Sequence, residues 1–242
     1  GDLDAALAPQ AAEVETSTRL SAHKLDVADA TSFGEFLADA ENHHGRTIDV
    51  LVNNAGIMPN GAFLGGTERI DRLVMDVNVH GVINGMRAVL PGMIERGQGH
   101  IVNVASLAGK FPLQGLAVYN ASKFAAVGLT AAARLETADT GVSVTAILPS
   151  AVRTELSSGI ELGILPAVDP EDIARAIVGS VRSRAAEIAV PAYVGFATKT
   201  VPFIPERVFR VFRRLVRDDA AINRVDHDVR RKYLDRVEGR SQ

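Results

Sequence analysis

Hydrophobic positions along the chain fall into short apolar runs that alternate with longer stretches of helical periodicity. The apolar runs predict buried strands, and the periodic stretches predict amphipathic helices. The predicted strands are Arg19–Leu25, Ile48–Val52, Ile101–Ala105, Val142–Leu148 and Glu187–Val190, and the predicted helices are Thr31–His43, Arg69–Val77, Val79–Arg96, Leu116–Thr137 and Asp169–Ser183. This alternation predicts an α/β fold with a parallel sheet and helices on both faces.

Three side chains with complementary chemistry lie near one another in this scheme. Ser106 closes the predicted strand HIVNVAS, so its hydroxyl should lie at a strand's carboxyl end, where parallel sheets bind ligands. Tyr119 and Lys123 are four residues apart and should share one helix face. An ammonium beside a phenol favours the phenolate, so we expect Lys123 to lower the pKa of Tyr119. Tyr119 could then exchange a proton with a substrate oxygen.

Together with NNAG (Asn53–Gly56) and PSAVRT (Pro149–Thr154), these residues resemble the short-chain dehydrogenase/reductase family. The resemblance extends to about Val190 and implies a Rossmann-like doubly wound sheet in a single domain. It makes Tyr119 the acid or base, Lys123 the residue that tunes its pKa and holds the nicotinamide ribose, and Ser106 the donor to the substrate oxygen. Asn78, in VMDVNVHGV, falls at the fourth catalytic position, where it would hold a water that links Lys123 to solvent.

The family opens with a strand and a Gly-rich turn that binds the pyrophosphate. The sequence starts with GDLDAALAPQ and contains no such turn. We expect about 35 residues to precede this sequence in the full-length protein. The expected organisation is a catalytic domain over residues 1–190 and a helical extension over residues 191–242.

The resemblance also assigns cofactor contacts. Asp2 or Asp4 is expected at the ribose hydroxyls, where a carboxylate repels a 2′-phosphate and favours NAD over NADP. Asp2 matches the family position better, and Asp4 could equally well cap a helix. Asp26 and Val27 match the adenine contacts, and Gly56 would let the backbone approach the ribose. The full expected set is Asp2, Asp26, Val27, Asn53, Ala55, Gly56, Tyr119, Lys123, Pro149, Val152 and Thr154. Asn53 should also tie neighbouring strands together.

One motif position departs from the family, because Ser150 stands where the family has Gly. If that position required a positive φ, Ser would cost about 1 kcal/mol, so either the turn differs or strain is stored there.

These residues predict hydride transfer between a nicotinamide cofactor and a lipophilic alcohol or ketone. The segment Glu155–Val168 is rich in Leu and Ile and suggests a mobile lid. The expected substrate contacts are Ser106, Leu107, Phe111 and Leu156, although the apolar members could equally pack against protein. The alternative function is a catalytically silent binding or regulatory protein with this fold.

Composition narrows the partners. The chain has 47% hydrophobic residues, a net charge of −3 and no Cys, which disfavours nucleic acid and excludes disulfides and thiolate metal sites. The His residues form no ligand pattern, so no metal is expected. Apolar residues on more than one face of Val79–Arg96 and Leu116–Thr137 predict a homodimer or homotetramer, and a cytoplasmic enzyme is expected.

The tail adds a second charge pattern, because Lys199–Arg217 holds six basic residues and one acid. Within it, apolar residues recur at helical spacing between arginines. Such a helix could attach peripherally to an anionic membrane, or it could cover the pocket or a neighbouring subunit.

Overall fold

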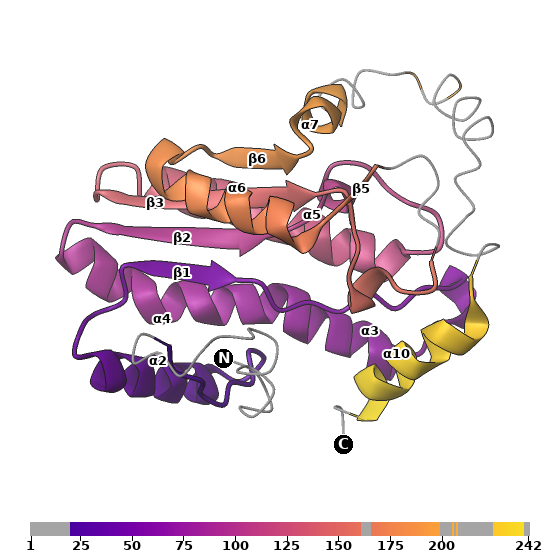
Figure 1. The fold of residues 1–242 in the computed structure, drawn as a ribbon, viewed down its shortest axis with the longest axis horizontal. Coiled ribbons are helices and arrows are strands. Elements are labelled where there is room, and N and C mark those ends of the chain that lie inside the picture. The colour runs from indigo at the N-terminus through magenta and orange to yellow at the C-terminus, as the bar shows by residue number, and fades with distance from the viewer. Residues whose placement is uncertain (1–19, 161–165, 199–204, 206, 208–224, 240–242) are drawn as a thin grey trace.

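A computed structural model shows an α/β fold in which helices cover both faces of a parallel sheet (Figure 1). The structure describes residues 20–160, 166–198, 205, 207 and 225–239. In this part of the chain the main sheet has the order β1-β2-β3-β6, and each neighbouring pair is parallel. The strands are β1 (Val50–Asn53), β2 (Gly99–Val104), β3 (Val142–Pro149) and β6 (Glu187–Val190).

The two central strands are buried on both faces. Every residue of β3 is buried, and so is every residue of β2 except the last. Ile101 packs in the cluster on the side of α4 (Gly81–Glu95), whereas Val102 packs in the cluster on the side of α6 (Pro170–Ser183). Neighbouring residues of a strand point to opposite faces, so the long apolar runs of the sequence follow from this double coverage.

Helix termini are fixed by local chemistry. In α2 (Ala30–His44), the side chain of Asp29 accepts a hydrogen bond from the backbone N of Thr31, and Gly45 ends the helix with a φ of 62°. Asp169 and Asp172 form a capping box at the start of α6.

The remaining described elements are short, except for α5 and the last helix. They are η1 (Phe63–Gly65), α3 (Glu68–Met75), a π-helical turn at Asp76–His80, η3 (Leu107–Gly109), α5 (Ala117–Glu136), β4 (Ala151–Val152), η4 (Glu155–Ser157), β5 (Ala167–Val168), α7 (Ala192–Thr198) and α10 (His227–Gly239). β4 and β5 form a separate two-stranded parallel ladder.

Two predicted elements differ from the structure. Arg19–Leu25 was expected to be a strand, but in its described part only Lys24 forms a bridge, because a strand exists only where a neighbour satisfies a continuous row of backbone groups. A break was expected between helices at Asn78. The backbone instead continues from α3 to α4 through the π-helical turn, whose wider winding keeps the helix intact while shifting its side chains.

Asp2 and most of the basic tail Lys199–Arg217 lie outside the described residues, so their roles and the proposed division at residue 190 stay predictions. No helix among the described residues is both long and apolar enough to span a membrane.

Candidate active site

A pocket of about 720 Å³ opens at the carboxyl ends of β1, β2 and β3. The strand ends contribute the segments 54–58, 104–108 and 149–152, so residues far apart in sequence meet at one edge of the sheet. Ser106, Tyr119 and Lys123 all line this pocket, as the sequence predicted.

Ser106 follows β2 and begins η3. Its hydroxyl accepts a hydrogen bond from the Ala108 backbone N at 3.1 Å and donates to the Pro149 carbonyl at 3.5 Å. Lys123 lies one turn after Tyr119 in α5, with its Nζ 5.7 Å from the centre of the Tyr119 ring. The Lys123 ammonium donates to the Val104 carbonyl at 3.1 Å, which holds it beneath the end of β2.

Burial dominates the ionisation of both groups. It raises the pKa of Tyr119 to about 12, against the lowering effect of the Ser106 hydroxyl. It also lowers the pKa of Lys123 to about 8. The expected lowering of the Tyr119 pKa by Lys123 is therefore not what this structure shows, because desolvation disfavours the charged form of each side chain. At neutral pH the phenol is protonated and the amine is still largely charged.

Asn78 acts on the loop that follows β1. Its Oδ1 accepts from the Ile57 backbone N at 2.8 Å, and its Nδ2 donates to the Ile57 carbonyl at 2.9 Å and to the Ser122 hydroxyl at 2.9 Å. The π-helical turn aims this fully buried amide at the loop. Asn78 thus fixes the loop beside Lys123, whereas the water relay remains a prediction.

Gly56 leaves room at the pocket wall beside Asn78 and Lys123. A Cβ built on Gly56 would lie 3.3 Å from Asn78 Oδ1 and 3.5 Å from Lys123 Nζ, so a side chain there would crowd the pocket wall. Of the expected cofactor contacts, those that line the pocket are Asp26, Val27, Ala55, Gly56, Tyr119, Lys123, Pro149, Val152 and Thr154. These residues would hold the adenine, ribose and nicotinamide portions of such a cofactor.

Two expected features take a different form. Asn53 does not line the pocket; its Nδ2 donates to Asn103 Oδ1 at 2.8 Å, which confirms that it ties β1 to β2. Ser150 is absent from the non-glycine residues with positive φ in the described chain, so the turn differs there and no strain is stored. The backbone N of Ser150 instead donates to the Val190 carbonyl at 2.8 Å.

Of the expected apolar substrate contacts, two line the pocket and one does not. Leu107 and Leu156 line the pocket together with Leu113. Phe111 is a correction, because it does not line the pocket and lies half-buried against the cluster that contains Ala105 and Val127.

Sequence reasoning missed one wall of the pocket. Tyr233, Arg236 and Val237 line it from α10, which is more than a hundred residues from Tyr119 in the chain. Tyr233 and Val237 are four apart and both buried, but the surrounding sequence HDVRRKYLDRVEG is so charged that its apolar stripe is hard to recognise.

No cluster of His, Cys, Asp or Glu suited to a metal ion occurs among the residues that the structure describes.

Comparison with known proteins agrees with this geometry. The sequence model of short chain dehydrogenases matches residues 3–163. An uncharacterised oxidoreductase of Staphylococcus saprophyticus is 37% identical over 167 residues, which are 69% of this chain and 68% of that protein. The 17-beta-hydroxysteroid dehydrogenase 13 of Rattus norvegicus is 32% identical over 69% of this chain, but the match spans only 57% of the rat protein. A solved structure of ElxO with NADP bound has a TM-score of 0.61 and 26% identity, covering 69% of this chain and 75% of ElxO.

Proposed function

The chain belongs to the short-chain dehydrogenase family, and from this premise we propose that it interconverts a lipophilic ketone and its alcohol. The observation that carries the proposal is the meeting of Ser106, Tyr119 and Lys123 in one pocket. A nicotinamide cofactor bound there supplies the hydride for reduction or accepts it in oxidation.

The ionisation of the site suits Tyr119 as the acid in carbonyl reduction. With a pKa of about 12, the phenol carries its proton at neutral pH and can give it to the substrate oxygen as the carbonyl carbon gains a hydride. The Ser106 hydroxyl donates to the same oxygen and stabilises its developing charge. The Lys123 ammonium stabilises the phenolate that remains on Tyr119, which then regains a proton from solvent.

The walls of the pocket support a lipophilic substrate. Beyond the catalytic groups they include Met58, Leu113, Leu116 and Leu156, of which Met58 and Leu116 belong to the same buried cluster as Tyr119. The rat relative carries the name of a hydroxysteroid dehydrogenase, and a steroid is one example of such a lipophilic alcohol. We therefore propose a ketone with a mainly apolar body.

The test of the reaction is the variant Tyr119→Phe in the full-length protein. Nicotinamide absorbance is followed with a panel of apolar ketones and alcohols, and removal of the proton donor should lower turnover by about 10² to 10⁴-fold. Tyr193→Phe is the matched control, because Tyr193 lies exposed on α7. Retention of the wild-type rate in Tyr119→Phe would disprove the assignment, and a wild-type protein that binds cofactor without turnover would favour the silent binding protein.

We further propose that NAD is preferred over NADP, although ElxO, a structural relative, was solved with NADP. The proposal rests on the acidic side chain of Asp2, which would accept from the ribose hydroxyls and repel a 2′-phosphate. Titration of NADH and NADPH by nicotinamide fluorescence should give tighter binding of NADH. In Asp2→Ala the difference should shrink, and equal affinities in the wild-type protein would refute the role of Asp2.

A further inference from the structure

The inward face of α10 is built from side chains that are buried although the helix is highly charged. Arg230, Tyr233 and Val237 are 2%, 7% and 5% exposed, and their spacing of three and four residues places them on one stripe. The neighbours Arg231 and Lys232 are exposed. Burying a guanidinium costs free energy unless its N–H donors form hydrogen bonds. The hydrogen-bond partners of Arg230 therefore indicate its role.

Arg230 satisfies its donors with neutral oxygens from two separate loops. From the loop after β1 it contacts the Met58 carbonyl and, at 2.7 Å, Asn60 Oδ1. From the loop after β4 it contacts the Leu156 carbonyl at 2.8 Å. Among the described residues no carboxylate pairs with Arg230. The planar fork of Arg can bond several oxygens at once, so this single side chain joins both loops to α10.

Tyr233 completes the hold on the first loop. Its hydroxyl accepts from the Met58 backbone N at 2.8 Å, while the Arg230 guanidinium lies 4.2 Å from the Tyr233 ring centre. Met58 is therefore bonded through both its N–H and its C=O by α10. Ile57, the residue before it, is bonded through both groups by Asn78. Two consecutive residues of the pocket wall are fixed in this way, Ile57 by Asn78 and Met58 by α10.

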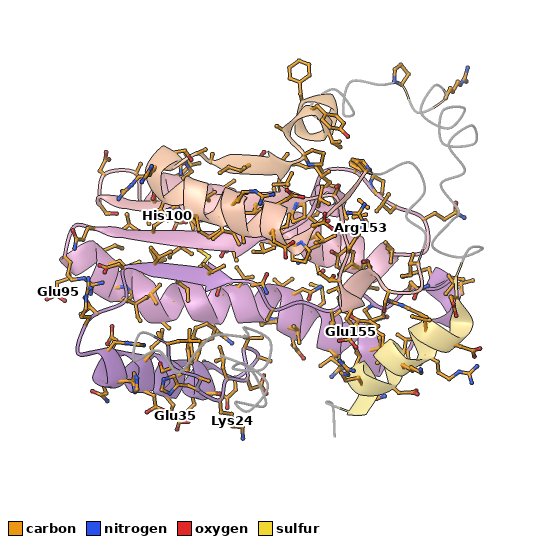
Figure 2. All side chains as sticks on the ribbon, viewed as in Figure 1. Lys24, Glu35, Glu95, His100, Arg153 and Glu155 are labelled. Atoms are coloured by element: carbon orange, nitrogen blue, oxygen red, sulfur yellow. The ribbon has the colours of Figure 1, made fainter. Side chains whose placement is uncertain are left out.

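The second loop meets α10 along its length. Arg236 forms an ion pair with Glu155, and Glu155 lies beside α10 in Figure 2. Nearer the start of α10, Ile160 pairs with Val225, and the Asp226 backbone N donates to the Gly159 carbonyl at 2.8 Å. A Cβ on Gly159 would lie 2.9 Å from the Asp226 carbonyl, so the contact is close enough to require Gly there.

From these contacts we propose that α10 is the substrate-side wall of the pocket, in which Tyr233 and Val237 determine which substrates fit and Arg230 is the positioning residue that seats the wall. The proposal rests on the proposed reductase function and deepens it. The substrate class is a ketone whose apolar body extends from Tyr119 toward Val237, between Met58 and Leu156. The interaction of the two phenols supports the arrangement, since Tyr233 is one of the groups that raise the pKa of Tyr119.

Substrate selection is tested with Val237→Phe. The larger side chain fills the pocket, so kcat/KM for a bulky ketone should fall at least about tenfold relative to a small one, while KM for the cofactor stays unchanged. Val229→Phe is the matched control, because Val229 is 41% exposed on the same helix and does not line the pocket. An unchanged ratio of the two substrates in Val237→Phe would overturn the role of α10 as a wall.

The seating role is tested by hydrogen exchange, which does not depend on activity. Arg230→Met should speed exchange in residues 54–60 and 155–160, with Arg231→Met as the control and Arg230→Lys intermediate. Tyr233→Phe should speed exchange of the Met58 amide, whereas Tyr193→Phe should not. If neither loop changes in Arg230→Met, α10 does not position the wall. A wild-type protein without turnover would refute the proposed reaction and leave this exchange result standing.

Discussion

At the scale of single residues, the site places a buried amine one helical turn from a buried phenol. Burial shifts the pKa values of these two groups in opposite directions. The pKa of Lys123 falls toward neutrality, and that of Tyr119 rises away from it. Both shifts favour the neutral form. At neutral pH Tyr119 is therefore protonated and Lys123 is positively charged, and a modest rise in pH deprotonates Lys123.

This difference predicts the pH dependence of carbonyl reduction. Below about pH 8 Lys123 is charged and can stabilise the Tyr119 phenolate, and above it the amine is neutral. We expect kcat/KM for the cofactor, which reports ionisations of the free enzyme, to fall as pH rises through about 8. Lys123→Met should be slow and show no inflection there. An inflection that persists in this variant would assign the titration to another group.

The residues that sequence predicted best are those whose type and spacing carry chemistry. Ser106, Tyr119 and Lys123 meet as expected because a strand end and one helix turn fix their relative places. Arg230 could not be predicted, since the partners that justify burying it are carbonyls of loops 70 and more residues away. Every residue has a backbone carbonyl, so residue types do not reveal which carbonyls will accept hydrogen bonds from Arg230.

At the scale of elements, a strand was predicted correctly where its own residues determine its burial and wrongly where its pairing depends on another segment. Val142–Leu148 and Glu187–Val190 were predicted within one residue, because an apolar run in a parallel sheet is buried on both faces. Arg19–Leu25 failed because pairing depends on a neighbour that its own pattern does not specify. The π-helical turn was taken for a break at Asn78, since an extra residue in a helical turn leaves the apolar repeat out of phase in just the way a helix boundary does.

His100 shows how an element is held in the sheet, and it predicts a pH-dependent stability. This fully buried side chain on β2 bonds Ser143 of β3 at 2.7 Å and Ser180 of α6 at 2.9 Å, beneath α6 in Figure 2. Burial lowers its pKa, and nearby Arg184 and Arg134 act in the same direction. The unfolded chain therefore binds a proton at His100 near pH 6.5 while the folded protein does not.

The free energy of unfolding should consequently fall as pH drops below about 6.5, by at most about 1.4 kcal/mol per pH unit for this one proton. His100→Gln removes the titrating group, so its stability should depend less steeply on pH between about 6.5 and 5 although the variant is less stable at neutral pH. Urea unfolding at several pH values measures both. His44→Gln, at the exposed end of α2, is the control, and equal slopes for wild type and His100→Gln would contradict the argument.

At the scale of the whole molecule, apolar side chains remain at the surface of the long helices that flank the sheet. Leu135 and Phe124 on α5 are 80% and 43% exposed, and Ile94 on α4 is 43% exposed. Single exposed apolar residues are common on monomers, but three on two helices of the same face of the sheet are the kind of surface that a second copy buries. These residues support the proposal of a homodimer or homotetramer.

We therefore expect light scattering of the full-length protein to give the mass of a dimer or tetramer at micromolar concentration. Replacing Phe124 and Leu135 together by Asp places charges in the proposed interface, where desolvation without a partner disfavours association, so this variant should have a lower mass. Leu64→Asp is the control, because Leu64 is 95% exposed on η1, away from both helices in sequence, and its mass should match wild type. A monomeric wild-type protein would refute the assembly, and an unchanged mass in the double variant would place the interface on another face, such as that of α6, where Val178 is 71% exposed.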